Sequence, residues 1–482
     1  NAELAGYATE SSILIVVSNF QDTTWTATVA DAVHYLFSRA EAYGMPCVIN
    51  ASLGNYSGSH DGRDIPTQIM NDLITDTTGR IMVCAAGNSG ETPPYHLGYE
   101  SSSDTNFTWF QTASNATYGN GQVYFEIFGD LNDFESIHFS VGADKITPNF
   151  EYRGHIPFAT VVDRLYVVHT DTLLSSSGNY LGIVQSAADS LNGTYRLAFF
   201  VSLIDSINFN YSLLATGSGR LDLWCTANPQ ISGLNDMVSS GLPTTAQFPA
   251  ISRYKSPDAK QYTAGNWACS EKIITVGNFT NRTSYVNVNG NNTVFPTLTE
   301  GGIALSSSGG PSRTGTVKPD IAAPGEVVLA AGAAYQIANQ IAFGQSDRVA
   351  ADGMHHRASG TSMASPAAAG IAAAFLEYCP NANWEDFKTA LIAGAKSDGF
   401  PGSAPNDRWG YGKADAVNTL KYFQPKSSLV SDGNALCEGK SLDISLGENF
   451  PSVLWTSGQT ASTISVNQGG VYFATLTNEL GC

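Results

Sequence analysis

Hydrophobic and polar residues follow two periodicities in the first 90 residues of this chain. Continuous apolar runs of strand length occur at Ser12–Ser18, Pro46–Asn50 and Arg80–Ala86, and stretches of helical character lie between them at residues 25–43 and 65–78. Continuous β-branched runs are typical of strands that are covered on both faces. Strands that alternate with helices at this spacing predict a parallel sheet with helices on both faces.

The pattern changes between about residues 101 and 262. Short segments of alternating apolar and polar residues are separated by turn residues, which predicts an antiparallel β-sandwich or jelly roll. The predicted strands are Val123–Phe128, Ile137–Val141, Thr160–His169, Arg196–Val201 and Arg220–Trp224. The apolar run Lys272–Gly277 then restores the α/β pattern. We therefore expect the β-domain to be inserted into a loop of the α/β domain, where insertions are tolerated.

The last part of the chain is again rich in predicted strands. Helical stretches near residues 383–395 and 413–421 close the α/β domain, and four short alternating segments around Trp455 follow a polar linker. This arrangement predicts a small immunoglobulin-like β-sandwich. The expected boundaries are 1–100 and 263–424 for the two parts of the α/β domain, 101–262 for the inserted jelly roll, 425–434 for the linker and 435–482 for the immunoglobulin-like module.

Seven cysteines are present. Cys437 and Cys482 bracket the C-terminal module, and we expect a disulfide between them to stabilise so short a domain. The other expectations are buried thiols at Cys47 and Cys84 and an alternative pair across the insertion at Cys225 and Cys269. No spacing of histidine and cysteine suggests structural zinc, and no metal ligands are assigned.

Composition and charge exclude some classes of function. The 482 residues carry a formal net charge of −18 and no basic stripe, which argues against nucleic acid as a partner. No apolar run approaches the length of a membrane-spanning helix, so none is expected. The chain has no initiator Met and no signal peptide. We therefore expect it to be an interior piece of a longer precursor.

Three short motifs occur at the ends of predicted elements. Asn50–Gly54 ends one strand, Cys84–Asn88 ends the next, and Gly360–Pro366 (Gly-Thr-Ser-Met-Ala-Ser-Pro) opens an alanine-rich helix. The carboxyl ends of parallel strands face a common crevice where ligands bind. A helix N-terminus favours negative charge, which a tetrahedral acyl-transfer intermediate carries on its oxyanion. The hydroxyl of Ser362, at this helix start, is therefore a candidate nucleophile.

In this order the three motifs resemble those of the subtilase (subtilisin-like) family of serine proteases. Two more segments agree: Val317–Gly325 resembles the family's strand and turn before the serine helix, and Trp409–Asp415 resembles its closing segment. The resemblance covers roughly residues 1–90 and 263–424. It implies a subtilisin-like α/β fold and a serine-type endopeptidase activity.

The resemblance also implies a role for each matching residue. Ser362 would be the acylated nucleophile, and Asn88 would donate its side-chain amide to the oxyanion. The substrate edge and the first specificity pocket would be formed by Ser52, Leu53, Gly54, Ala85, Ala86 and Gly87. Gly54 and Gly87 are expected to leave that pocket open to a sizeable side chain. No cofactor is required by the resemblance, and a structural calcium ion is compatible with it.

The resemblance is incomplete at the general base. A nucleophilic serine needs a base and an acid that orients it, and the family carries both motifs upstream of the segment matched by Leu4–Ser12. His60, His355 and His356 are the local candidates, and we expect each to be a loop residue. We therefore expect a segment outside this chain, either a cleaved fragment or an upstream part of the precursor, to supply the Asp and the His.

Without that segment, residues 1–482 are expected to be essentially inactive, because the triad histidine accounts for most of the turnover of such enzymes. The alternative is a catalytically inactive subtilase scaffold that acts as a binding or structural component at the cell surface. The absent base and the two accessory β-domains motivate this alternative.

Two wider resemblances concern the β-rich parts. The insertion resembles the jelly-roll domain of a subset of subtilases that includes the clostridial germination proteases. The tail resembles the immunoglobulin-like modules of secreted Bacteroidetes proteins, which often precede a type IX secretion sorting domain. These resemblances imply a secreted or cell-surface protein. Its partners would be a peptide or protein substrate, its own N-terminal fragment or propeptide, and cell-surface or secretion-system proteins.

Overall fold

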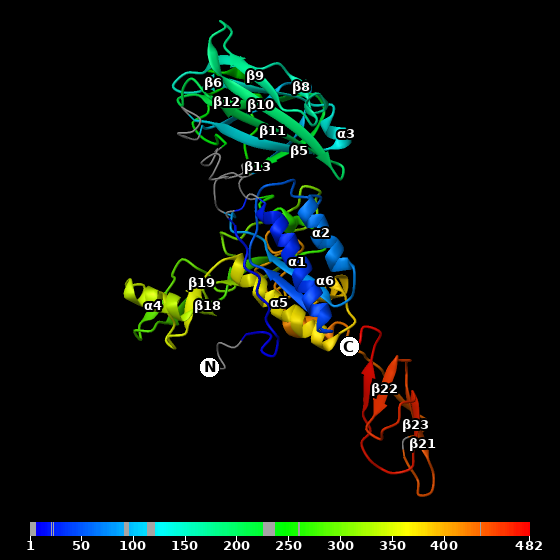
Figure 1. Cartoon of the computed structure of the whole chain (residues 1–482). Coiled ribbons are helices and arrows are strands. Elements are labelled where there is room, and N and C mark those ends of the chain that lie inside the picture. Colours follow the sequence, from blue (N-terminus) through cyan, green and yellow to red (C-terminus); the bar gives the residue numbers. More distant parts are fainter. Residues whose placement is uncertain are drawn as a thin grey trace.

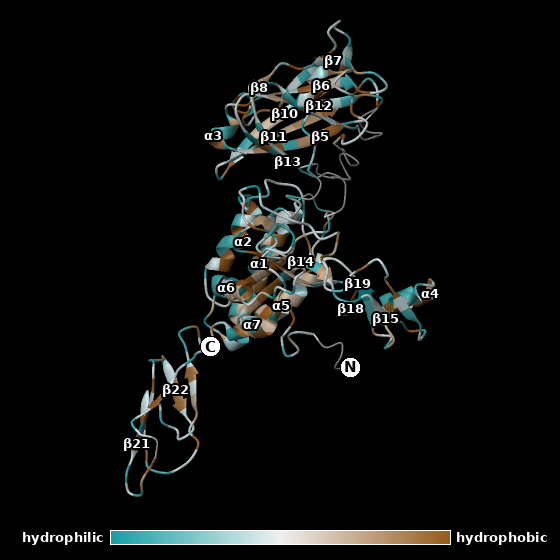
Figure 2. Ribbon diagram, turned by 180° about the vertical axis from the view of Figure 1, so that it is seen from behind, coloured by the Kyte–Doolittle hydropathy of each residue, from teal (hydrophilic) through white to brown (hydrophobic). Residues whose placement is uncertain are grey.

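The computed structural model describes residues 6–20, 22, 24–90, 96–112, 121–224, 237–258, 261–433 and 435–482. An α/β domain lies in the middle of the molecule, and a β-sandwich and a small C-terminal β-module lie at its opposite ends (Figure 1). In Figure 2 the apolar residues of the middle domain gather where its central helices pack. The β-sandwich, which interrupts the α/β domain along the chain, therefore lies at one end of the molecule in space, and the C-terminal module lies at the other.

The middle domain is built on a four-stranded parallel sheet with the strand order β1-β2-β14-β17. These strands are β1 (Cys47–Ala51), β2 (Arg80–Ala85), β14 (Ile274–Thr280) and β17 (Ile321–Glu326). The helices are α1 (Trp25–Ala42), α2 (Ile65–Thr75), α5 (Thr361–Tyr378), α6 (Trp384–Ala393) and α7 (Ala416–Lys421). The predicted parallel sheet with helices on both faces is confirmed.

Side chains that alternate along β2 fill two cores. Ile81 and Val83 pack with α5 and α6 on one face of the sheet, whereas Met82 and Cys84 pack with α1 and α2 on the other, as the period-2 geometry of a strand requires. The buried face of α5 consists largely of alanine, so the helix axis can approach the strands closely. The sheet therefore holds the N-terminus of α5 near the carboxyl ends of its strands.

Residues 12–18 form no strand, contrary to the prediction. Ile13, Ile15 and Val17 are 80%, 80% and 91% exposed, and the segment has no regular secondary structure. A strand needs a hydrogen-bonded neighbour, and within the described residues β1 pairs only with β2 and forms an open edge of the sheet. The apolar pattern identified a segment with the composition of a strand, but no strand of the described ranges pairs with it.

The inserted domain consists of two packed antiparallel sheets, with the orders β3-β13-β5-β11-β10-β9 and β4-β12-β6-β7, and with β8 beside β6. Its strands are β3 (His96–Ser101), β4 (Asn106–Phe110), β5 (Val123–Asp130), β6 (His138–Lys145), β7 (Glu151–His155), β8 (Ala159–Thr160), β9 (His169–Leu174), β10 (Tyr180–Leu191), β11 (Thr194–Ser202), β12 (Asn210–Thr216) and β13 (Gly219–Trp224). The first strand pairs with the last. The two ends of the insertion therefore lie side by side, as insertion into a single loop requires.

Two details of the insertion differ from the prediction. Strand β3 begins at His96, ahead of the expected boundary at residue 101. The expected strand 160–169 is interrupted, because Tyr166 adopts a φ of +59° and residues 162–164 form a 3₁₀ turn. Positive φ is incompatible with a continuous strand of a non-glycine residue, so alternation of apolar residues alone overestimated this element.

A small excursion projects from the middle domain (Figure 1). It contains a hairpin of β15 (Ser284–Val286) and β16 (Asn292–Val294), and a pair of strands, β18 (Val328–Ala331) and β19 (His355–Ala358), on either side of helix α4 (Ala334–Ala342). The sequence prediction did not include these elements. They are short, and their burial depends on one another rather than on the main core.

The C-terminal module is a pair of small antiparallel sheets around the buried Trp455. One sheet contains β20 (Leu429–Ser431), β21 (Leu442–Leu446) and β23 (Thr463–Val466), and the other contains β22 (Ser452–Trp455) and β24 (Ala474–Thr477). The four strands predicted within residues 435–482 are present. Strand β20, however, comes from the segment 425–434 that was expected to be a linker.

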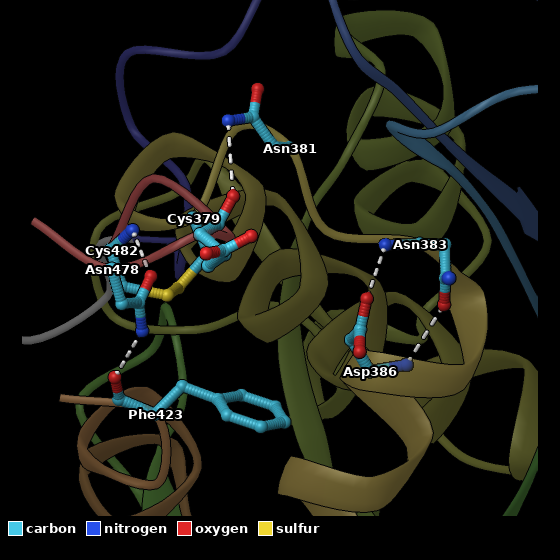
Figure 3. The surroundings of a disulfide bond; sticks show 8 residues. Cys379, Asn381, Asn383, Asp386, Phe423, Asn478 and Cys482 are labelled. Atoms are coloured by element: carbon cyan, nitrogen blue, oxygen red, sulfur yellow. Dashed lines mark hydrogen bonds between the residues drawn. A yellow bond between two sulfur atoms is a disulfide. The ribbon is translucent and has the colours of Figure 1, made fainter. Parts of the chain in front are cut away.

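The predicted disulfide between Cys437 and Cys482 is wrong. Cys482 is bonded to Cys379, which ends helix α5 (Figure 3). Cys437 is an exposed free thiol. The reason lies in how the C-terminal residues dock: Asn381 N–H donates to the Leu480 carbonyl at 3.1 Å. The Asn478 side chain donates to the Phe423 carbonyl at 2.8 Å. These contacts direct Cys482 into the core beside α5 rather than into its own module.

The remaining cysteines follow the prediction in part. Cys84 is a buried free thiol, as expected, and Cys47 is half-buried. Cys269 is also a buried free thiol, which contradicts its alternative pairing, and Cys225 lies outside the described residues.

Candidate active site

The first turn of α5 is shaped by a glycine before it and a proline within it. Gly360 precedes the helix with a φ of +126°, and its N–H donates to the Gly325 carbonyl at 2.8 Å. Thr361 and Ser362 are the first two helical residues. Pro366 has no N–H to donate to the Ser362 carbonyl, four residues back. The hydroxyl of Ser52 donates to this carbonyl instead, at 2.7 Å.

The substrate edge expected at residues 52–54 therefore contacts the helix start directly. The Ser362 hydroxyl donates to the Ser52 carbonyl at 3.2 Å. One turn further, Ser365 donates to the Asn50 side chain at 2.6 Å, and Asn50 in turn donates to the Ser52 hydroxyl at 3.0 Å. Leu53 is half-buried and Gly54 is exposed. These bonds join the end of β1 to the residue expected to be the nucleophile.

Asn88 follows β2 and lies against the same helix start. Its Oδ1 accepts hydrogen bonds from the Thr361 N–H at 3.0 Å and the Thr361 hydroxyl at 3.2 Å. The hydroxyl of Thr361 is itself 3.1 Å from the N–H of Gly87, which donates to it. Within the described part of the chain, Nδ2 of Asn88 makes no hydrogen bond, and the residue is exposed. The amide is thus oriented by its oxygen and presents its two N–H groups outward.

The space beside Gly87 is filled, whereas a Cβ added at Gly54 would meet nothing within 4 Å. Ala85 and Ala86 are buried in the sheet. A Cβ at Gly87 would overlap Tyr56 Oη and would lie 2.8 Å from Ser308 Oγ. Gly87 is required here because of this crowding and because of its φ of +113°. The sequence prediction missed Tyr56, since nothing in the pattern around it indicates that its hydroxyl returns to the end of β2.

The local histidines are engaged elsewhere. The buried His60 ring lies 2.8 Å from the Ala264 carbonyl and 3.0 Å from the Tyr56 carbonyl, and it stacks on Trp224 with 4.2 Å between ring centroids. Burial lowers the pKa of His60 to about 4, although its bonds with the two carbonyls act in the opposite direction. This ring packs against the inserted domain and is not a base for Ser362.

The other candidate histidines also have their own partners. His355 contacts Asp352 at 2.6 Å, and His356 contacts Gln340 at 3.3 Å, both in the excursion. None of the hydrogen bonds within the described residues joins a histidine to Ser362. His60 lies in a loop, as expected, whereas His355 and His356 lie on strand β19 and not in the expected loop.

A network of charges joins the loop after the substrate edge to the inserted domain. Arg313 donates to Asp61 at 2.5 Å and to Asp130 and Thr194 at 3.0 Å each. Arg63 donates to the same Asp130 at 2.9 Å. Burial would raise the pKa of Asp61, but the Arg313 guanidinium and further hydrogen bonds bring it below its usual range. The loop 55–64 is therefore fixed between two domains.

The ranges that the structure describes contain no group of three or more His, Cys, Asp or Glu side chains that could hold a metal ion. In these same ranges no helix is both long and apolar enough to cross a lipid bilayer. We assign no ligands for calcium.

The sequence matches the model of the subtilase family over residues 1–125 and 186–412. The serine protease AprX of Bacillus subtilis (strain 168) is 32% identical over 164 residues, which are 34% of this chain and 33% of AprX. The chain thus matches about one third of the length of this relative. The structure resembles the CspB protease of Clostridium perfringens with a TM-score of 0.58 and 19% identity, over 83% of this chain and 72% of CspB.

At 19% identity the likeness to CspB shows a shared fold alone. The family model, however, covers well over half of the chain and includes all three motifs at the site. The chain therefore belongs to the subtilase family.

Proposed function

We propose that this protein is a subtilisin-like serine endopeptidase that hydrolyses peptide bonds through an acyl-enzyme on Ser362. The observation that carries the proposal is the meeting of three groups at one helix N-terminus: the Ser362 hydroxyl, the outward amide of Asn88 and the Ser52 edge. A nucleophile, an oxyanion donor and a strand that can pair with a peptide are the parts that acyl transfer requires.

The chemistry follows from these positions. The Ser362 oxygen adds to the substrate carbonyl carbon, its proton passes to the histidine base and then to the leaving amine, and water later releases the acyl group. The oxyanion would accept hydrogen bonds from Asn88 Nδ2 and from the N–H of Ser362. At the second position of α5 this N–H has no acceptor within the helix. The helix dipole stabilises the same negative charge.

The Asp and His of the triad are proposed to come from an N-terminal segment outside residues 1–482. Two features support this part of the proposal. Strand β1 has an open edge within the described residues, and the apolar segment 12–18 is exposed. An added strand between them would satisfy the hydrogen bonds of the edge and cover apolar surface.

We further propose that the protein acts outside the cell or on its surface. The Cys379–Cys482 disulfide supports this location, because disulfides persist in oxidising compartments. The inserted antiparallel sandwich is proposed to be a jelly roll, and the C-terminal module an immunoglobulin-like domain of the type IX secretion class. The substrate would be a peptide or protein strand.

The proposal is tested with a fluorophosphonate probe, which labels activated serines. We expect the full-length, naturally processed protein to be labelled at Ser362, as located by peptide mass spectrometry. Ser362→Ala should abolish the label, and residues 1–482 alone should remain unlabelled. An unlabelled processed protein, or a label that persists in Ser362→Ala, would refute the proposal.

One observation favours a second candidate, an inactive scaffold that binds partners. The Ser362 hydroxyl donates to the Ser52 carbonyl, and within the described residues it contacts no histidine. This candidate predicts that the segment upstream of Asn1 lacks Asp and His motifs of the family. It also predicts that a peptide substrate binds the processed protein without being cleaved.

A further inference from the structure

The loop that carries Asn88 is held by a complete set of backbone hydrogen bonds. Four of its five N–H groups donate within the core of the domain: Ala86 to the Val276 carbonyl at 3.0 Å, Gly87 to Thr361 Oγ1 at 3.1 Å, Ser89 to Ser308 Oγ at 3.0 Å and Gly90 to the Ser306 carbonyl at 2.9 Å. The fifth, the N–H of Asn88, donates to Tyr56 Oη at 2.9 Å. The residue expected to bind the oxyanion therefore depends on a side chain from the substrate-edge loop.

Tyr56 is placed to act on Asn88 and on its neighbours together. Its hydroxyl lies 3.3 Å from Ser308 Oγ, which holds the N–H of Ser89. The same hydroxyl fills the space beside Gly87. One phenol group thus lies directly against Gly87 and Asn88, and it reaches Ser89 through Ser308. Loss of one neutral hydrogen bond costs about 0.5–1.5 kcal/mol, so removal of this hydroxyl would loosen the loop at Asn88.

Tyr56 is itself fixed from the inserted domain. Its carbonyl lies 3.0 Å from Nε2 of His60, and the His60 ring stacks on Trp224 at the end of β13. The backbone of His60 is held as well, because its N–H donates to Asn266 Oδ1 at 2.9 Å. A continuous series of contacts therefore runs from Trp224 through His60 and Tyr56 to Asn88.

We propose that Tyr56 is a positioning residue that fixes the oxyanion-binding amide of Asn88 and connects it to the inserted domain; this inference rests on the endopeptidase function proposed above. The Asn88 side chain is oriented at its oxygen by Thr361, and its backbone is oriented by Tyr56. Because both the side-chain oxygen and the backbone of Asn88 are held by hydrogen bonds, its Nδ2 group points in one fixed direction. Stabilisation of an oxyanion depends strongly on such preorganised donors.

The test compares Tyr56→Phe with the native protein in the full-length, naturally processed form. The variant keeps the aromatic ring and loses only the hydroxyl. We expect kcat to fall about three- to tenfold, the effect of one neutral hydrogen bond, while KM stays within about twofold because the donor acts in the transition state. In an Asn88→Ala background the same change should have no further effect on kcat.

Tyr285→Phe is the matched control. Like that of Tyr56, the hydroxyl of Tyr285 is hydrogen-bonded to the backbone, since it donates to the Asp347 carbonyl at 2.6 Å, but Tyr285 lies in the excursion. Its loss should leave kcat unchanged. Amide hydrogen exchange of residues 86–90 gives a second readout that does not need turnover: Tyr56→Phe should accelerate it about three- to tenfold, and Tyr285→Phe should not.

Three outcomes would overturn the inference: an equal loss of kcat in the native and Asn88→Ala backgrounds, a rise in KM at constant kcat, or unchanged exchange of residues 86–90. If the proposed endopeptidase function is wrong, the experiments give a different set of results. In that case the processed protein cleaves no peptide and Ser362 takes no label, and the exchange measurement alone decides whether Tyr56 holds the loop.

Discussion

At the residue scale, His60 shows how burial decides the role of a histidine. His60 is one of the local candidates for the general base, and it stands next to Asp61 in the sequence. The structure buries the ring between two carbonyls and stacks it on Trp224. Asp61 is turned towards Arg313 instead of His60. Charge neutrality and packing, rather than proton transfer, are what this position requires.

The lowered pKa of His60 has a measurable consequence. Its pKa is about 4 in the folded protein, whereas an unfolded histidine titrates near pH 6.5, so the unfolded state binds more protons between these values. The stability contributed by the neutral ring is complete above about pH 6.5 and is lost as the pH falls towards 4, by up to about 3 kcal/mol. We expect the free energy of unfolding in urea to fall more steeply over this window in the native protein than in His60→Gln. Equal slopes would contradict the assignment.

At the element scale, a side-chain hydroxyl replaces a backbone N–H as hydrogen-bond donor at the start of α5. Pro366 removes the N–H that would serve the Ser362 carbonyl in a regular helix, and the Ser52 hydroxyl supplies a donor. The peptide group of Ser362 is therefore part of the contact between α5 and residue Ser52. This exchange explains why a proline is tolerated inside a buried helix.

A double-mutant cycle measures this exchange. Ser52→Ala should lower the free energy of unfolding by about 1–2 kcal/mol, because it leaves a buried carbonyl unpaired. In a Pro366→Ala background the restored N–H can serve that carbonyl, and Ser52→Ala should cost clearly less. Unfolding in denaturant supplies both numbers. Strictly additive effects of the two substitutions would show that the Ser52 bond does not replace the missing helical one.

At the scale of the whole molecule, the Cys379–Cys482 disulfide ties the far end of the chain to the helix that carries Ser362. It closes a loop with a sequence separation of 103 residues, which contains α6, α7 and the C-terminal module. A link of this kind restricts the unfolded chain strongly. It also keeps the C-terminal module at one place on the α/β domain.

Cys482→Ser tests this role, with Cys437→Ser as the matched control. The first variant should lose about 2–4 kcal/mol of stability and become more susceptible to proteolysis in residues 424–434. The control should behave as the native protein, because Cys437 is an exposed free thiol. Peptide mapping under non-reducing conditions reports the pairing directly. A Cys437–Cys482 peptide would contradict it.

The sequence predicted the middle domain well because its signals are local. Strands β1 and β2, helices α1 and α2 and the alanine-rich α5 each follow from apolar periodicity or helix propensity within one segment. The three motifs at the site are likewise contiguous, and a parallel sheet brings its strand ends together. Hydrogen bonds join Ser52 to Ser362 and Asn88 to Thr361 at the start of α5, and the roles of these residues stay predictions.

Contacts between segments that lie far apart along the chain could not be predicted from the sequence. Residues 12–18 have the composition of a strand, but pairing requires a neighbour that the pattern cannot supply. Cys482 pairs with Cys379 because the C-terminal residues dock on α5, not because of spacing. The return of Tyr56 to Asn88 depends on the path of a loop between two domains. By itself the sequence determined the family, the order of the domains and the chemical groups of the site. The tertiary structure alone decided which other residues hold these groups in place. The reason is that hydrogen bonds and disulfides form between atoms that folding brings together over large separations along the chain.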